Sequence, residues 1–199
     1  IDPKTLGMKC DGQLVDATFL THVMGFSALE SQKDYPFLIE DCCESHGATH
    51  KGQKLGTFGY ISNFSFYFAH HMSTIEGGMV CTNNEMAYEM IRTFRSHGMA
   101  REMRNPEIRA KVYREHYALR PEFLFLNPAY NVRSTELNAV LGLSQLKRLD
   151  ENNEKRVRNF EIFLNEISPK LYRTNLHTEG AVNYAFTLIL NEPDLKLRD

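Results

Sequence analysis

Short runs of β-branched and aromatic residues alternate with helical stretches along this chain, and that alternation constrains its fold more than any other feature. Strand-like runs occupy residues 17–24, 35–39, 63–68 and 78–82. Their lengths suit strands, and glycine or polar residues follow them. Strands that alternate with helices are typical of an α/β domain. The sequence therefore predicts an α/β fold.

A helix is predicted soon after the last of these runs. Residues 85–97 repeat apolar side chains at a helical spacing, at Met86, Met90, Ile91 and Phe94. Gly98 follows and suits the left-handed backbone that ends many helices. The next segment, residues 101–122, is charged and poorly periodic, so its pattern identifies neither a helix nor a strand.

A long helical pattern dominates the last third of the chain. It begins near Ser134 and stops at Pro169. Residues 182–190 then resemble a strand, and a helix as long as the preceding one often joins two domains. We therefore assign residues 1–150 to part of a large domain, and residues 151–199 to a linking helix and the start of a smaller C-terminal domain.

The composition excludes several classes of partner. The net charge is −2, and 23 Lys and Arg residues nearly balance 25 Asp and Glu residues without forming one basic block, so we expect no nucleic-acid partner. No apolar run approaches the roughly 18 residues that span a membrane, and no secretory signal is evident. We expect a cytoplasmic protein without a membrane partner.

The four cysteines, Cys10, Cys42, Cys43 and Cys81, lack the paired spacing of a zinc or redox site. We interpret them as reduced thiols. A metal site built from Cys42, Cys43, His46 and His50 is the weaker alternative, because these ligand types occur here without a recognised arrangement. We therefore expect no metal.

Three segments with polar and charged side chains lie at predicted strand ends, where open α/β sheets place their sites. They are residues 40–48 (EDCCESHGA), 65–80 (SFYFAHHMSTIEGGMV) and 131–137 (NVRSTEL). Together they resemble the DegT/DnrJ/EryC1/StrS family of sugar aminotransferases and its dehydratase branch. The likeness extends from residues 21–25 to residues 145–150, in the order and spacing of that family.

The resemblance implies the fold of aspartate aminotransferase, called fold type I of the transferases that depend on pyridoxal 5'-phosphate (PLP). In it, helices flank a mixed, mostly parallel sheet. Residues 1–150 would be part of the large, cofactor-binding domain. Relatives are longer, so the resemblance implies that the chain is a fragment. The expected cofactor is PLP or its amine form, pyridoxamine 5'-phosphate.

The resemblance also assigns cofactor-binding residues. Asp41 matches the acid that pairs with the pyridine nitrogen and keeps it protonated, so that the ring can accept electrons. Glu44 stands where many members carry a glutamine near the phenolic oxygen, but it fits a surface acid equally well. Ser65 matches a serine on the cofactor phosphate. Asn131 would reach the phosphate in the neighbouring subunit, where Arg133 either assists or only stabilises a helix start.

The position five residues after that serine distinguishes this chain from most of the family. Most members carry a lysine there, which holds the cofactor covalently. This chain has His70, followed by His71. Imidazole offers no primary amine, so the cofactor would be held non-covalently. A histidine, with an ordinary pKa of about 6.5, can still move protons. His70 is therefore the expected catalytic residue.

The His-for-Lys pattern resembles the sugar 3-dehydratases that use pyridoxamine phosphate. Only Cys81 follows His70, so the chain is similar to the type without an iron–sulfur cluster. We expect 3-dehydration of a nucleotide-linked 4-keto-6-deoxy sugar for polysaccharide biosynthesis, with an amino donor such as glutamate and a homodimeric assembly. The alternatives are a nucleotide-sugar aminotransferase and a catalytically silent scaffold of the same fold.

Overall fold

The computed structural model describes residues 4–8, 15–29 and 35–192 of the chain. They belong to two compact units. The first comprises Ile1–Met79 and Leu137–Asp199, and the second comprises Val80–Glu136. None of the helices in the described part of the chain is long and apolar enough to span a membrane.

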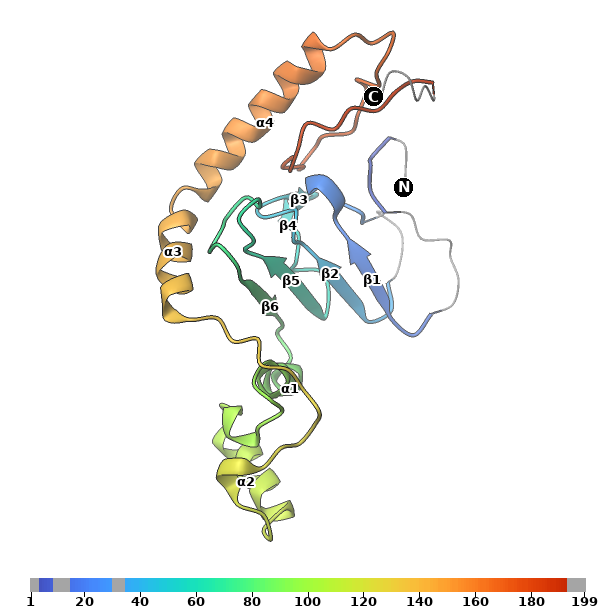
Figure 1. Ribbon diagram of the computed structural model, residues 1–199. Coiled ribbons are helices and arrows are strands. Elements are labelled where there is room, and N and C mark those ends of the chain that lie inside the picture. Colours follow the sequence, from blue (N-terminus) through green and yellow to red (C-terminus); the bar gives the residue numbers. More distant parts are fainter. Residues whose placement is uncertain (1–3, 9–14, 30–34, 193–199) are drawn as a thin grey trace. The chain divides into compact units, whose positions relative to one another are not determined.

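A four-stranded sheet is the main β structure (Figure 1). Its strands follow the order β1 (Thr18–Thr21), β2 (Leu38–Asp41), β5 (Ile61–Ser65) and β6 (Gly78–Cys81). Strand β1 runs parallel to β2, and β2 runs parallel to β5. The carboxyl ends of these three strands therefore lie at one edge of the sheet, where α/β proteins bind ligands.

The first strand is shorter than the predicted residues 17–24. After Thr21 the chain enters a 3-10 helix, η1 (Val23–Gly25), in which φ is 56° at Met24 and 88° at Gly25. A strand cannot continue through a left-handed backbone, so the predicted end was wrong. Glycine is required at position 25, because an added Cβ would lie 1.8 Å from the carbonyl oxygen of Val182.

Strand β2 contains the acidic pair that we expected to follow the strand. Glu40 is fully buried within it. A buried carboxylate is costly unless it is hydrogen-bonded, and Glu40 has four donors. The His22 ring lies 3.1 Å away, and three backbone amides donate at 2.7–2.8 Å, those of Gly56, Phe58 and Gly59. These bonds explain why the strand accommodates the acid.

Strands β5 and β6 lie close to the positions that the sequence predicts for them. Strand β5 overlaps the predicted residues 63–68, but it starts two residues earlier and ends three residues earlier. It ends there because the chain turns after Ser65, and the amide of His70 donates to the carbonyl of Tyr67 at 3.1 Å. Strand β6 matches the predicted residues 78–82 to within one residue.

A small antiparallel hairpin interrupts the connection from β2 to β5. It consists of β3 (Thr49–His50) and β4 (Gln53–Lys54). Its two turn residues, Lys51 and Gly52, have φ of 50° and 80°, as in the tight turns that match the twist of paired strands. The residues that flank the hairpin, Ala48 and Leu55, join Cys42 and Val182 in a buried cluster.

The predicted long helix is two helices. Helix α3 spans Glu136–Leu146 and α4 spans Leu149–Glu166, so the prediction of one continuous helix from Ser134 was wrong. Different contacts hold the two helices. The Asn138 side chain of α3 donates to the carbonyl of Thr74 at 2.9 Å, whereas Phe160 of α4 packs edge-on against Phe26 with ring centroids 6.1 Å apart.

Helix α1 (Glu85–Arg95) begins the second unit where the sequence predicts a helix, but its buried face is a different one. Met86 and Met90 are 56% and 48% exposed, whereas Glu89 is 2% exposed. The carboxylate of Glu89 accepts hydrogen bonds from the amides of Arg104 and Asn105 at 2.7 and 2.9 Å. These bonds hold the polar face inward.

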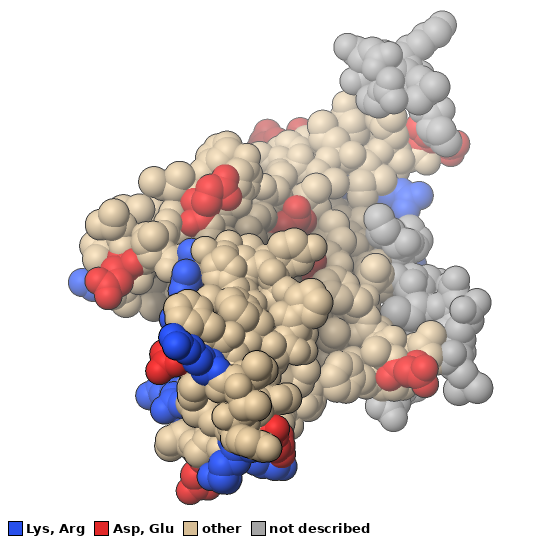
Figure 2. Space-filling view, turned by 60° about the horizontal axis from the view of Figure 1, so that its bottom comes forward, with Lys and Arg blue, Asp and Glu red and all other residues tan. Residues whose placement is uncertain are grey.

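The charged segment 101–122 contains a helix that its weak periodicity did not reveal. Helix α2 (Pro106–Glu115) lies between two 3-10 turns, η2 (Ala100–Glu102) and η3 (Pro121–Phe123). The Asn105 side chain accepts from the amides of Glu107 and Ile108, which caps the helix, and proline occupies its first turn. On the face in Figure 2, basic side chains are interspersed with acidic ones.

The predicted strand at residues 182–190 is irregular instead. Its first residues join η1 through the backbone: the amides of Val182 and Tyr184 donate to the carbonyls of Gly25 and Met24 at 3.1 and 2.9 Å. Farther along, a single β-bridge joins Tyr172 to Leu190. The prediction of a strand was therefore wrong for this segment.

Candidate active site

Asp41 ends β2, at the edge of the sheet where the parallel strands stop. Its Oδ1 accepts hydrogen bonds from the Asn63 side-chain amide at 2.9 Å and from the Cys43 backbone amide at 3.1 Å. Asn63 lies opposite Asp41 in the register between β2 and β5. Two donors on one oxygen hold the carboxylate in a fixed orientation.

Glu44 lies in the turn after β2, where its carboxylate is hydrogen-bonded to a backbone amide. Its Oε2 accepts a hydrogen bond from the amide of Met24 at 2.7 Å. Met24 has the left-handed backbone of η1, so this bond helps to hold the irregular turn that follows β1. Glu44 is half-buried in this position. Its contact with a cofactor oxygen stays a prediction.

Ser65 and His70 belong to β5 and to the loop that follows it. Ser65 is the last residue of β5, the strand next to β2, and its Oγ accepts from the amide of Tyr67 at 3.3 Å. The His70 ring is half-buried, with centroid distances of 6.0 Å to Tyr67 and 5.4 Å to Tyr184. Asp41 and Ser65 therefore end adjacent parallel strands, and His70 lies in the loop that leaves the second of them.

His46, which sequence reasoning weighed only as a metal ligand, contacts this loop. Its ring is 4% exposed and lies 6.1 Å from the ring of His70 and 5.9 Å from that of Phe66, centroid to centroid. Desolvation by burial, followed by the nearby His70, lowers the pKa of His46 to about 4. The ring is therefore neutral at neutral pH.

His71, one residue beyond His70, is buried and structural. Its Nε2 donates to the carbonyl oxygen of Val182 at 3.0 Å, which ties the loop after β5 to the C-terminal segment. Desolvation by burial, with the positive charge of Arg156, lowers the pKa of His71 to about 4. The two adjacent histidines thus have different surroundings.

The cysteines near Asp41 are thiols. Neither Cys42 nor Cys43 forms a disulfide within the described residues, and burial together with the Asp41 carboxylate raises the pKa of Cys43 to about 12. In the described part of the chain, the group close enough to share an ion is His22, Glu40 and Cys42. His22 Nδ1 accepts from the amide of Ala28 at 3.1 Å, so Nε2 carries the proton and donates to Glu40. The imidazole and the carboxylate of this group are therefore already hydrogen-bonded to protein groups.

The remaining two predicted residues, Asn131 and Arg133, belong to the second unit. Asn131 is exposed, and its side-chain oxygen accepts a hydrogen bond from Nε of Arg133 at 3.0 Å. Arg133 also lies 3.7 Å from the carboxylate of Glu102. The two residues thus interact directly with each other. Their part in binding a phosphate of a neighbouring subunit stays a prediction.

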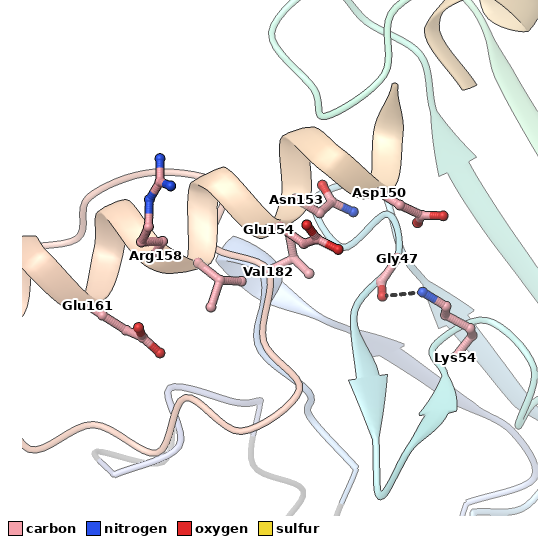
Figure 3. A pocket seen from close by; sticks show the side chains of 9 residues that line it. Gly47, Lys54, Asp150, Asn153, Glu154, Arg158, Glu161 and Val182 are labelled. Atoms are coloured by element: carbon pink, nitrogen blue, oxygen red, sulfur yellow. Dashed lines mark hydrogen bonds between the residues drawn. The ribbon is translucent and has the colours of Figure 1, made fainter. Parts of the chain in front are cut away.

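A pocket of about 560 Å³ opens between α4 and the turn that contains Gly47 (Figure 3). Charged side chains of both signs line it, among them Lys54, Asp150, Glu154, Arg158 and Glu161. Lys54 donates to the Gly47 carbonyl at 2.9 Å. None of the predicted site residues lines this pocket, and its mixed charge does not select a phosphate.

Comparisons with known proteins agree on one family. Residues 24–197 match the DegT/DnrJ/EryC1/StrS aminotransferase family. The chain is 32% identical to the GDP-4-keto-6-deoxy-D-mannose 3-dehydratase of Yersinia pseudotuberculosis, over 96% of this chain and 52% of that protein. The chain thus spans about half the length of this curated relative.

Solved structures give the same fold. One is a GDP-4-keto-6-deoxymannose-3-dehydratase with a trapped PLP-glutamate geminal diamine, at a TM-score of 0.73 and 24% identity over 98% of this chain and 54% of that one. Another is an aminotransferase from Psychrobacter cryohalolentis, at a TM-score of 0.58 and 34% identity over 76% of this chain and 39% of that one. These matches confirm the predicted α/β fold of the PLP-dependent enzymes. The chain belongs to the DegT/DnrJ/EryC1/StrS aminotransferase family.

Proposed function

We propose that the protein is a 3-dehydratase of a nucleotide-linked 4-keto-6-deoxy sugar, with pyridoxamine phosphate as cofactor and His70 as the base. The observation that carries the proposal is the imidazole at position 70, in the loop that leaves β5 beside the strand end of Asp41. Residues 65–80 contain no lysine that could hold the cofactor covalently.

The residues at the strand edge fit such a cofactor. Asp41 offers a carboxylate whose Oδ1 is fixed by Asn63 and Cys43, and a carboxylate held in this way suits a protonated ring nitrogen. Ser65 offers a hydroxyl at the end of the adjacent strand. When bound, pyridoxamine phosphate supplies an amine that condenses with the sugar ketone and a ring that accepts electrons.

His70 would take up the proton released at the reacting carbon, because imidazole exchanges protons near neutral pH. Its Nδ1 is buried, so Nε2 is the nitrogen available for this transfer. Asp41 would keep its negative charge beside the ring nitrogen throughout. Glu44 holds η1 through Met24 and would shape the edge of the site by this route.

The second candidate function is amino transfer to the same class of sugar. The 34% identity to the aminotransferase from Psychrobacter cryohalolentis favours it. The absence of lysine from residues 65–80 weighs against it, because amino transfer uses the lysine amine both to hold the cofactor and to shuttle the proton.

Product analysis distinguishes the two reactions. We would incubate the protein with pyridoxamine phosphate, glutamate and GDP- or CDP-4-keto-6-deoxyhexose, and identify the products by mass. Dehydration gives a 3-deoxy-4-keto sugar, one oxygen lighter than the substrate, with release of ammonia. Amino transfer gives a 4-amino sugar that keeps its C3 oxygen, which would contradict the proposal. A substrate that stays unchanged in the presence of bound cofactor would also contradict it, and would favour a silent scaffold.

A further inference from the structure

His46 occupies a firmly held turn beneath the loop of His70. The backbone carbonyl of His46 accepts a hydrogen bond from the Asn153 side chain of α4 at 2.8 Å. Within the turn, the amide of Ser45 donates to the carbonyl of Cys42, and the amide of Ala48 donates to that of Ser45. Figure 3 shows Asn153 projecting from α4 on the side of this turn. The position of the His46 ring is therefore set by the fold.

Both imidazoles carry buried nitrogens that lack a partner. Within the described structure neither ring nitrogen of His46 reaches full hydrogen-bond geometry, although the Ser65 backbone lies close enough to raise the pKa of the ring, and Nδ1 of His70 has no partner. A buried polar nitrogen left unpaired costs about 1–3 kcal/mol. The two rings are 6.1 Å apart at their centroids and inclined by 45°. Nitrogens that faced each other at this separation would be about 3.8 Å apart, so a hydrogen bond forms once the rings also approach by somewhat less than about 1 Å.

His71 lies closer to His46 than His70 does, at 5.7 Å between centroids, and its Nδ1 is also buried without a partner. Because Nε2 of His71 donates to Val182, that Nδ1 has only a lone pair and cannot donate to a lone pair of His46. The Tyr184 ring lies near both His70 and His71, tilted by 49° and 50°, and Arg156 of α4 donates to the Tyr184 carbonyl at 3.2 Å. His46 can therefore direct one ring nitrogen to the Ser65 backbone and keep the lone pair of the other for His70.

The protonation state of His46 suits an acceptor. Desolvation lowers its pKa to about 4, so at neutral pH the ring has one N–H and one nitrogen lone pair. A lone pair that accepts from Nδ1–H of His70 would fix the His70 tautomer with Nε2 unprotonated. This is how an orienting group prepares a histidine base in other enzymes.

We propose that His46 is a positioning residue for His70: it accepts a hydrogen bond from Nδ1 of His70, orients that ring and leaves Nε2 free to take the substrate proton. The catalytic part of this statement rests on the proposed function. The hydrogen bond itself does not, because it concerns only two side chains of this protein.

If His46 only fills space, replacing it with another buried ring should leave the tautomer of His70 unchanged. Phe64 and Phe66 lie 5.6 and 5.9 Å from the His46 ring between centroids, so phenylalanine suits the apolar surroundings of the site. His46→Phe therefore keeps the burial and removes the acceptor. His46→Gln restores an acceptor on a side chain of similar reach. His177→Gln is the matched control, because that histidine is 61% exposed at its side chain.

The test combines a spectroscopic and a kinetic measurement on the folded protein. The ¹⁵N chemical shifts of histidine report the tautomer of each ring, and a His70→Gln spectrum assigns the His70 signals. We expect His70 to be protonated at Nδ1 in the parent and in His46→Gln, and to lose that preference in His46→Phe. We also expect kcat for dehydration to fall about tenfold in His46→Phe with little change in KM, and to recover in part in His46→Gln.

The outcomes separate the two proposals. If the His70 signals are the same in the parent and in His46→Phe, the positioning role is wrong, whatever reaction the protein performs. If they change while no dehydration occurs in any variant, the hydrogen bond stands and the proposed function fails. Circular dichroism and a thermal melt must show that His46→Phe is folded. If it is not, His46→Asn takes its place, because the shorter amide does not reach His70. Its His70 signals are then compared with those of the parent and of His46→Gln.

Discussion

The side-chain amide of Asn63 donates a 2.9 Å hydrogen bond to the carboxylate of Asp41, which joins the ends of β2 and β5 at the edge of the sheet. The bond fixes the carboxylate that we expect to face the cofactor ring.

Asp41→Asn should weaken binding of pyridoxamine phosphate about tenfold or more, because it removes a charge-assisted hydrogen bond. Asn63→Ala should weaken it less. Fluorescence titration measures both, and Asp16→Asn on the exposed surface is the control. Equal affinity in Asp41→Asn and the parent would remove Asp41 from the site.

Glu40 should be one of the most sensitive positions for stability. Burial raises its pKa, but the hydrogen bonds from His22 and from the amides of Gly56, Gly59 and Phe58 outweigh burial and leave the pKa lowered. Glu40→Gln should lower the free energy of unfolding at neutral pH by about 2–4 kcal/mol, because an amide group then faces a backbone N–H. Urea denaturation measures this, with exposed Glu151→Gln as the control.

The sign of the Glu40 contribution to pH dependence follows from its lowered pKa. The stabilisation is fully present above the unfolded pKa of about 4.3 and is lost as pH falls through the folded value. The difference in unfolding free energy between the parent and Glu40→Gln should therefore shrink at acidic pH. A difference that stays constant or grows on acidification would show that the carboxylate is not the stabilising form.

Two buried histidines should make the protein sensitive to mild acid. The pKa values of His46 and His71 are both lowered to about 4, chiefly by desolvation. The unfolded chain, with histidine pKa values of about 6.5, binds more protons as pH falls below that value. The free energy of unfolding should therefore fall between about pH 7 and pH 5, by roughly 1–2 kcal/mol for each histidine. His46→Phe should reduce this loss, and His177→Gln should leave it unchanged.

His70→Lys should give the protein a covalently held cofactor. A lysine amine condenses with the aldehyde of PLP and imidazole does not, so the variant should gain an absorbance band that borohydride abolishes. Dehydration should fall at the same time, because lysine, with an ordinary pKa near 10.4, is a poorer base at neutral pH. A parent protein that already traps its cofactor with borohydride, or a lysine variant that dehydrates as fast as the parent, would exclude the proposed role of His70. His71→Asn is a poor control, because it breaks the bond to Val182.

The predicted dimer can be tested by subunit complementation. If Asn131 serves the cofactor of the neighbouring subunit, Asn131→Leu and His70→Gln damage different halves of each site. Each variant alone should be nearly inactive. Dimers reassembled from a mixture should regain about a quarter of the parent activity, because half of them are hybrids with one intact site in two. Mixing that restores nothing, while each variant still forms dimers, would place Asn131 and His70 in the same subunit's site or remove Asn131 from it.

The sequence predicts the sheet well because its strands carry local signals. Strand β6 and helix α1 begin within one residue of the expected positions. The errors have identifiable physical causes. The end of β1 depends on the close approach of Gly25 to Val182, a contact across more than 150 positions that no local pattern contains. Helix α2 lacks a strong apolar stripe, although the Asn105–Pro106 pair is a start signal that could have revealed it.

Some site residues can be predicted from the sequence and others cannot. Asp41 and Ser65 end strands, His70 lies in the loop after the second of them, and all three are identified by their spacing in the family motif. His46 is not, because only the packing of the turn after β2 against the loop after β5 brings its ring near His70. Its histidine identity was the one available signal, and in sequence it suggested a metal ligand. A side chain that acts through another is hard to identify before the fold is known.

The hydrogen bonds of Glu40 have a consequence for how this sequence can vary in evolution. Its three backbone donors come from Gly56, Phe58 and Gly59, so the loop is recognised through its main chain. Exchange of the exposed Thr57 side chain would remove its own bonds to Gln53 and Lys54 but would leave these three intact. An insertion or deletion between positions 54 and 59 would instead move the amides away from a buried negative charge. Homologous chains should accordingly keep the same loop length and the glycines at positions 56 and 59, where an added Cβ would lie 2.6 Å from another atom.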